Sequence, residues 1–403
     1  MATIPLHEPV CPGKAGSVFF AAGFRPFFLV AALQAALTLP LWLAVYAGGV
    51  DLNLPFSPLL WHGHEMVFGF AGAAIGGFLL TAVPNWTNCR ALGGWPLMVL
   101  FAVWLAGRAA FTLAGYLPAA VVMMADLSYV PLLAFLVGRP LVAIGKARNM
   151  IFLPILTLFL AANLGVHLDI FFAIGDGQKA ILAGLGLVLL MIAIVGGRIV
   201  PSFTQNWLRM QGQTVELKPI AWMEKGGAPL VLVVAMGLHL ALGQSLVAGG
   251  ALLIAAAIHG LRLWRWLGWR TIAAPILSVL HLGYGWMVVG LGLLGLSSLV
   301  SWLPASAALH ALTAGAVGTM IMAVMSRAAL GHSGRPLVLA PAVVVAYALL
   351  SLGTVLRVVA PLVSDAQMGL THAGGSLWAL AWVLFAWVYF PILTKARADG
   401  RAG

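Results

Sequence analysis

Long, nearly uncharged runs of apolar residues are the feature that most restricts the fold of this chain. Its 403 residues are 62% hydrophobic and 8% charged, whereas a soluble globular protein is about half apolar and about a quarter charged. The composition therefore excludes a soluble enzyme and a disordered chain. The net charge of +11 does not indicate a nucleic-acid partner, because the charges stand singly or in small groups between the apolar runs. We expect membrane lipid around this protein.

Twelve apolar segments are long enough to cross a bilayer, which takes about 20 helical residues. The sequence therefore predicts an all-α polytopic membrane protein, a bundle of about 12 transmembrane helices that forms a single domain over residues 24–394. Residues 1–23 precede the bundle, and residues 395–403 form a short tail. The predicted helices cover residues 24–46, 59–83, 95–113, 117–138, 149–168, 178–200, 219–241, 245–265, 272–296, 304–328, 337–361 and 369–393.

Basic residues indicate how this bundle is oriented. If the N-terminus is cytoplasmic, 18 of the 21 lysines and arginines lie in loops or at helix ends on the cytoplasmic side, Lys179 lies on the opposite side, and Arg108 and Arg357 lie inside spans. Cytoplasmic loops carry such an excess of basic residues in membrane proteins, so we expect both termini to be cytoplasmic. The longest polar connection, from about Pro201 to Pro219, falls on the same side.

Cysteine does not supply a metal site here. Cys11 and Cys89 lie far apart, and neither belongs to a CxxC pair. This excludes a thiol-ligated zinc site, an ordinary iron–sulfur cluster and covalent attachment of a c-type haem.

Histidine is the side chain that most strongly suggests a site. A polar group in hydrocarbon costs several kcal/mol unless it is paired, and neutral imidazole is the commonest metal ligand. A histidine near a helix end can instead be satisfied by interfacial water, and we favour that role for His7, His167 and His372. His259 and His281, on consecutive helices at similar depth, are candidates for a bis-imidazole haem. The candidate metal ligands are His62, His64, His239, His281 and His310.

The segment from Trp61 to Met66 is the richest in candidates. Ser57 and Pro58 are typical of an N-cap and a first helical position. At 100° per residue, His62 and His64 point about 200° apart, so they cannot share one metal on a regular helix. The spacing indicates two adjacent sites, or one ligand beside one hydrogen-bonding residue. Glu65 is the candidate catalytic residue, either as a proton donor or as a partner that orients a ligand.

Arg108 lies inside the third predicted helix and has two interpretations. It forms an ion pair with an acid such as Asp126 on the next helix, or it binds a haem propionate. Arg357, in the eleventh predicted helix, has the same two interpretations.

Several short strings in this chain, taken together and in order, resemble the NnrS family over nearly the whole length. They are FRPFF at 24–28, WHGHEMVFGF at 61–70, GFLLTAVPNW at 77–86, GGRIVPSFT at 196–204, HLGY at 281–284, HALT at 310–313 and GHSGRP at 331–336. The resemblance implies a twelve-helix protein of the bacterial inner membrane that contains haem b and copper. It also implies a link to denitrification and to nitric oxide resistance.

Three functions follow from this resemblance and from the polar residues. The first is a haem/copper protein that reduces or detoxifies nitric oxide with electrons from an unidentified donor, in which Glu65 relays protons. The second is a metal-bound sensor or assembly factor without turnover, and the third is a secondary transporter. The oligomeric state stays open. For the first function, the candidate cofactor-binding residues are His62, His64, His259, His281, His310 and Arg108.

Overall fold

The computed structural model describes residues 17–401 except residues 214 and 216. His7, Cys11 and most of the segment 1–23 lie outside the described residues. Within the described part of the chain, every regular element is helical, and twelve helices are long and apolar enough to cross a membrane. The predicted fold class and the predicted number of spans are therefore confirmed.

Several of these spans consist of more than one helical element. In chain order they are α1 (Phe24–Tyr46); α2 (Pro58–His64), η2 (Glu65–Ala71) and α3 (Gly72–Thr87); α4 (Trp95–Thr112); α5 (Ala119–Leu127) and α6 (Tyr129–Ile144); α7 (Ala147–Met150) and α8 (Phe152–Phe172); α9 (Gly177–Met210); η4 (Met223–Gly227) and α10 (Ala228–Leu242); α11 (Leu246–Arg265); α12 (Pro275–Ser297); α13 (Ala305–His310), η6 (Ala311–Val317) and α14 (Gly318–His332); α15 (Pro341–Val359) and η7 (Ala360–Leu362); and η8 (Ser364–Ala366) and α16 (Gln367–Thr394).

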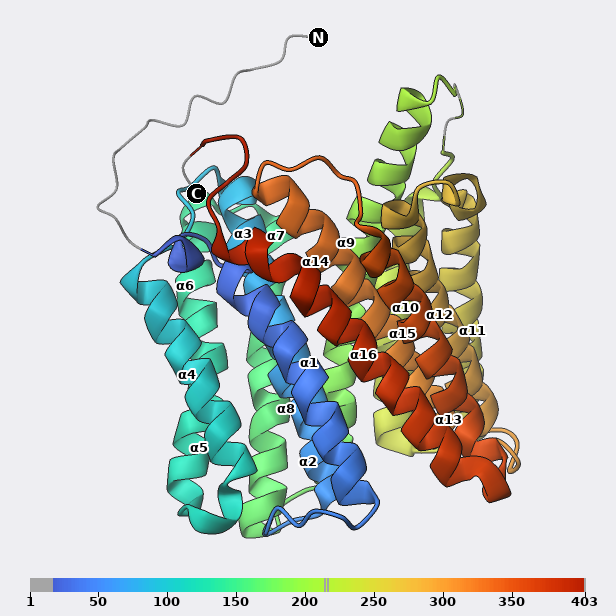
Figure 1. The fold of residues 1–403 in the computed structure, drawn as a ribbon. Coiled ribbons are helices and arrows are strands. Elements are labelled where there is room, and N and C mark those ends of the chain that lie inside the picture. The colour runs from blue at the N-terminus through green and yellow to red at the C-terminus, as the bar shows by residue number, and fades with distance from the viewer. Residues whose placement is uncertain (1–16, 214, 216, 402–403) are drawn as a thin grey trace.

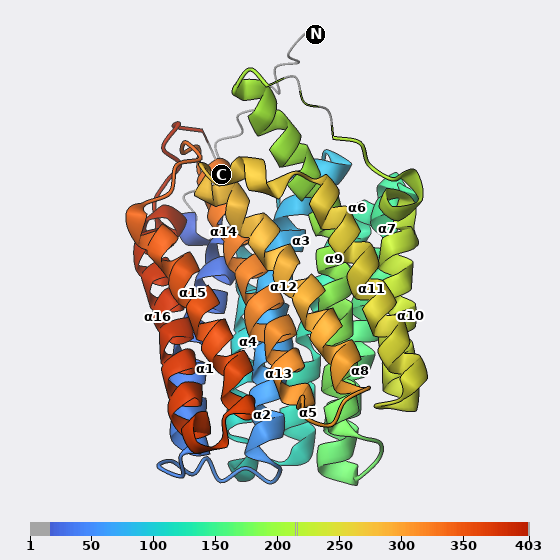
Figure 2. The same ribbon diagram turned by 90° about the vertical axis from the view of Figure 1, so that its right-hand side faces the viewer.

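The spans run up and down through one bundle, so the described chain begins and ends at the same end of it (Figure 1). We call this end the Phe24 end and the opposite one the Tyr46 end, after the two ends of α1. Helices α4, α5, α6 and α8 form one side of the bundle, and α10, α11 and α12 form the other (Figures 1 and 2). Helix α16 packs against both α1 and α15, which joins the last spans to the first.

Helix α9 is longer than the sequence predicts. The predicted helix stops at residue 200, before a polar connection from Pro201 to Pro219, whereas α9 continues through Pro201 to Met210. A proline inside a helix removes one backbone hydrogen bond, and packing beyond it offsets that loss. Thr204 is buried, and its hydroxyl lies 2.8 Å from Nε2 of His281 on α12. The predicted boundary is therefore wrong because a contact between two spans extends the helix.

Two spans share an unusual local form near the Tyr46 end. The π-helical segments η2 and η6 each contain seven residues. Each segment directly follows a histidine, His64 or His310, and each directly precedes a glycine, Gly72 or Gly318. π-Helical turns are rare and are frequent at functional sites. These two segments therefore mark the Tyr46 end as the place to look for a site.

Close packing of α11 against α12 gives a direct test of the bundle. An added Cβ at Gly249 would lie 2.9 Å from the backbone oxygen of Gly295, whereas one at Gly250 would meet no atom within 4 Å. Both Gly249→Ala and Gly250→Ala gain the same helix propensity, so their difference isolates packing. We expect Gly249→Ala to unfold at a lower temperature in detergent than Gly250→Ala. The corresponding difference in the free energy of unfolding should be about 1–3 kcal/mol. Equal melting temperatures would contradict this helix contact.

Candidate functional site

His62 and His64 lie on α2 near the Tyr46 end, and their side chains enter different surroundings. The ring of His62 stacks on Trp42 of α1, with 4.6 Å between the ring centroids, and lines a cavity. The ring of His64 stacks on Phe111 of α4 at 3.6 Å and enters a group of buried polar side chains. The helical twist therefore separates the two imidazoles as expected, while the two interpretations of this segment, two adjacent sites or one ligand beside one hydrogen-bonding residue, stay predictions.

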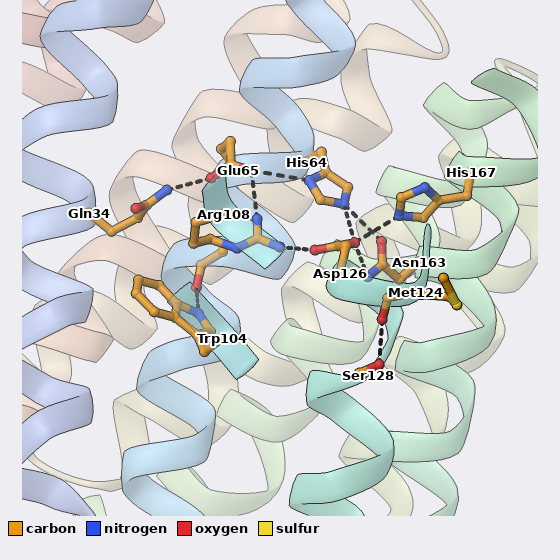
Figure 3. Close-up of polar contacts among 11 residues, drawn as sticks. Gln34, His64, Glu65, Trp104, Arg108, Met124, Asp126, Ser128, Asn163 and His167 are labelled. Atoms are coloured by element: carbon orange, nitrogen blue, oxygen red, sulfur yellow. Dashed lines mark hydrogen bonds and ion pairs between the residues drawn. The ribbon is translucent and has the colours of Figure 1, made fainter. Parts of the chain in front are cut away.

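The buried polar group on the His64 side draws side chains from five spans (Figure 3). We call it the polar cluster. Its members are Gln34, His64, Glu65, Arg108, Asp126, Asn163 and His167.

Arg108 joins the two carboxylates of the polar cluster. Its Nη1 donates to Oε1 of Glu65 at 2.6 Å, and its Nη2 forms an ion pair with Asp126. The Nε2 of Gln34 on α1 donates to the other oxygen of Glu65 at 2.5 Å. The glycine at 69 leaves room for this arrangement, because a Cβ there would lie 3.0 Å from Nη1 of Arg108. The ion-pair interpretation of Arg108 is therefore confirmed.

Asp126 also connects the two imidazoles of the cluster. Its Oδ2 lies 3.1 Å from Nε2 of His64 and 2.8 Å from Nε2 of His167. Asn163 supports both sides, since its Nδ2 donates to the same Oδ2 at 2.9 Å and its Oδ1 lies 2.9 Å from Nε2 of His64. His64, Asp126 and His167 each offer one ligand atom, and these atoms lie within 4.8 Å of one another. All three residues are buried, and they form a group that can hold a metal ion.

The prediction that His167 is an interfacial residue is wrong. Its side chain is fully buried in α8 and contacts Asp126 rather than water. A signal for this was present in the sequence. Asn163 and His167 are four residues apart, and such residues lie on one face of a helix. Two polar side chains on one face of an apolar helix indicate a partner on a neighbouring span.

The charges of the polar cluster favour a bound cation. Glu65 and Asp126 carry two negative charges when ionised, and Arg108 supplies one positive charge. Burial of the remaining negative charge is expensive unless a cation or a proton compensates it. The Nδ1 atoms of His64 and His167 are buried without a hydrogen-bond partner. Two imidazoles with carboxylate and amide oxygens suit transition metals such as copper, zinc or iron.

The cavity on the His62 side is also lined by His310 and Arg357. His62 comes from α2, His310 from the end of α13 and Arg357 from α15. The structure thus brings two of the predicted ligands together, although they are far apart in the sequence.

The remaining predicted ligands lie outside both places. His239 is near the end of α10. At the Phe24 end, His259 uses both ring nitrogens, with Nδ1 at 2.6 Å from the Tyr284 hydroxyl and Nε2 at 3.1 Å from the Ala228 carbonyl. His281 contacts a threonine on α9, as described above. A haem between His259 and His281 stays a prediction.

Comparison with known proteins places these features in a family. No curated protein matches the chain at a significant level. The model of the family described as NnrS protein matches residues 18–397, which include the polar cluster and the cavity. The chain therefore belongs to the NnrS family.

Proposed function

We propose that this protein is a haem- and copper-containing protein of the bacterial inner membrane that reduces or detoxifies nitric oxide. The observation that supports this most directly is the buried His64–Asp126–His167 group, because its donor atoms suit a redox-active transition metal. The location also suits the substrate. Nitric oxide is small, neutral and soluble in lipid, so it reaches a metal between apolar helices without a polar channel.

Each residue of the polar cluster has a role in this proposal. His64, His167 and Asp126 hold the metal, and Asn163 fixes both His64 and Asp126 through its amide. A copper ion bound there would supply an electron-transfer centre and an open position for a small ligand.

Glu65 is the residue that we assign to proton delivery. Reduction of two molecules of nitric oxide to nitrous oxide and water consumes two electrons and two protons. Glu65 lies beside the metal-binding group, with its Oε1 at 3.5 Å from Nδ1 of His64. Its other oxygen accepts a hydrogen bond from Gln34 on α1. A carboxyl group between a ligand imidazole and a neighbouring span can pass a proton in either direction.

The proposal is tested by metal content and turnover of the purified protein. We expect copper in the wild-type protein, and nitric oxide consumption when an artificial one-electron donor is supplied. His64→Ala and His167→Ala should each lower copper affinity at least tenfold, because loss of a direct ligand exceeds the roughly 10–100-fold effect of losing a partner of a ligand. His372→Ala, at the start of α16, is the matched control and should keep its copper.

Other results would favour the other functions. Copper and haem without consumption of nitric oxide would indicate a sensor or an assembly factor. A protein that contains neither metal, even after growth with abundant iron and copper, would remove the proposal and favour a transporter.

A further inference from the structure

We propose that the cavity between α1, α2, α13, α15 and α16 is the haem site, with His62 and His310 as the two iron ligands and Arg357 as the partner of a haem carboxylate. We call it the His62–His310 cavity. This inference rests on the proposed function, since it assigns the haem to one place in the bundle. It differs from the sequence prediction that pairs His259 with His281.

The lining of the His62–His310 cavity fits a mostly apolar molecule. Gly353, Gly374 and Gly375 line one side, where α15 and α16 approach each other closely, so this wall is largely backbone. Most other lining side chains are apolar or aromatic, among them Leu39, Met66, Phe70, Val188 and Trp378.

Both imidazoles in the cavity are arranged as metal ligands. The Nδ1 of His310 donates to the Ser306 carbonyl at 2.7 Å, which leaves the lone pair of Nε2 available to a ligand. A metal-binding histidine typically donates its other ring N–H to such an acceptor. The Nδ1 of His62 is buried without a hydrogen-bond partner, while stacking on Trp42 fixes the ring. Imidazole is also a usual protein ligand of haem iron.

The two π-helical segments are associated with this cavity. Residues of both η2 and η6 line it, and the two ligands lie on the short helices α2 and α13 that precede these segments. A π-helical turn changes the direction of the side chains on either side of it relative to a regular helix. The same local form therefore lies beside both proposed ligands and contributes residues to the wall of their cavity.

Arg357 indicates that the molecule bound in the cavity carries a negative charge. Among the described residues, no carboxylate forms an ion pair with its guanidinium, although the residue lies within a membrane span. A cation within a span is expensive and is normally paired. Haem carries two propionates, and a planar guanidinium binds a carboxylate through two parallel hydrogen bonds. A neutral quinone would leave this arginine without a partner.

The test compares two histidines that are two residues apart on the same helix. We expect His62→Ala to lose at least about 90% of the haem, measured by the pyridine haemochrome spectrum, and to keep its copper. His64→Ala should show the reverse pattern, with haem kept and copper lost. His310→Ala should match His62→Ala, and imidazole added to the growth medium should restore part of the haem in both variants.

Three further variants keep the inference testable if the alanine variants fold poorly. Because a methionine sulfur also binds haem iron, His62→Met and His310→Met should keep haem but shift its Soret band and its low-spin electron paramagnetic resonance signal. Arg357→Gln should lower haem content without changing the spin state, because the ligands remain.

The inference would be overturned if the His62 and His310 variants kept the wild-type spectrum, if His259→Ala or His281→Ala removed it, or if a quinone co-purified in the cavity in place of haem. Each of these outcomes leaves the polar cluster and its copper untouched, so the proposed function would survive. A wild-type protein without haem and without copper would defeat both.

Discussion

Replacing Arg108 by methionine should destabilise this protein more than any other single change in the polar cluster. The guanidinium is the positive group between Glu65 and Asp126, and its removal leaves two buried carboxylates without their shared partner. Loss of one member of a buried ion pair typically lowers the free energy of unfolding by about 3–5 kcal/mol. Thermal unfolding of the purified protein in detergent measures this as a large drop in melting temperature.

Two companion variants separate charge from geometry at Arg108. Arg108→Met combined with Glu65→Gln should recover part of the lost stability, because it removes one of the two unpaired charges. Arg108→Lys should fall between Arg108→Met and the wild type, since one ammonium group cannot match the two hydrogen-bonding directions of a guanidinium. A melting temperature of Arg108→Met within one or two degrees of the wild type would contradict the ion pairs of Arg108.

Replacing Asp126 by asparagine should affect metal binding more than stability, unlike the replacement of Arg108. We expect a large loss of metal affinity and a small loss in the free energy of unfolding. Asparagine keeps the size of the side chain and removes its negative charge. The single positive charge of Arg108 then balances the single negative charge of Glu65. The metal-free cluster then becomes neutral, so its burial is less expensive. Metal affinity should fall at least about 100-fold, because a direct ligand and the attraction of the site for cations disappear together.

The matched control for this prediction is Asp169→Asn on α8, two residues after His167. Asp169 is a carboxylate on the same helix, and it lies outside the polar cluster. Metal titration followed by thermal unfolding should therefore show wild-type affinity in Asp169→Asn and lost affinity in Asp126→Asn. An Asp126→Asn protein that binds metal as tightly as the wild type would show that the carboxylate is no ligand.

The sequence allows prediction of the features that depend on one helix at a time. Apolar runs report span positions because each helix must be compatible with lipid by itself, and the predicted spans agree with the structure within several residues except at the end of α9. The angular separation of His62 and His64 follows in the same way from the helical twist. The pairing of Arg108 with Asp126 can be predicted because two consecutive antiparallel spans bring their connected ends together.

Features that depend on how distant helices pack could not be predicted in this way. Gln34, Asn163 and His167 join the polar cluster through contacts of α1 with η2 and of α8 with α2 and α5. The spacing of Asn163 and His167 indicates that α8 has a polar partner, but no single helix shows which neighbour supplies it. The meeting of His62 with His310 depends on spans that are far apart in the chain, and on two π-helical segments that no local pattern signals. Sequence periodicity indicates which face of a helix is buried. It does not indicate which neighbouring helix covers that face.

The positions of the lining residues in the sequence also set the order in which the two sites can form. All side chains of the polar cluster come from positions 34 to 167. All of them have therefore been synthesised once the fifth span has entered the bilayer. The His62–His310 cavity needs Trp378 on the final span as a wall. During biosynthesis the metal ion that we propose for the polar cluster would therefore find its ligands early, whereas the haem that we propose for the cavity would have to wait for the end of translation.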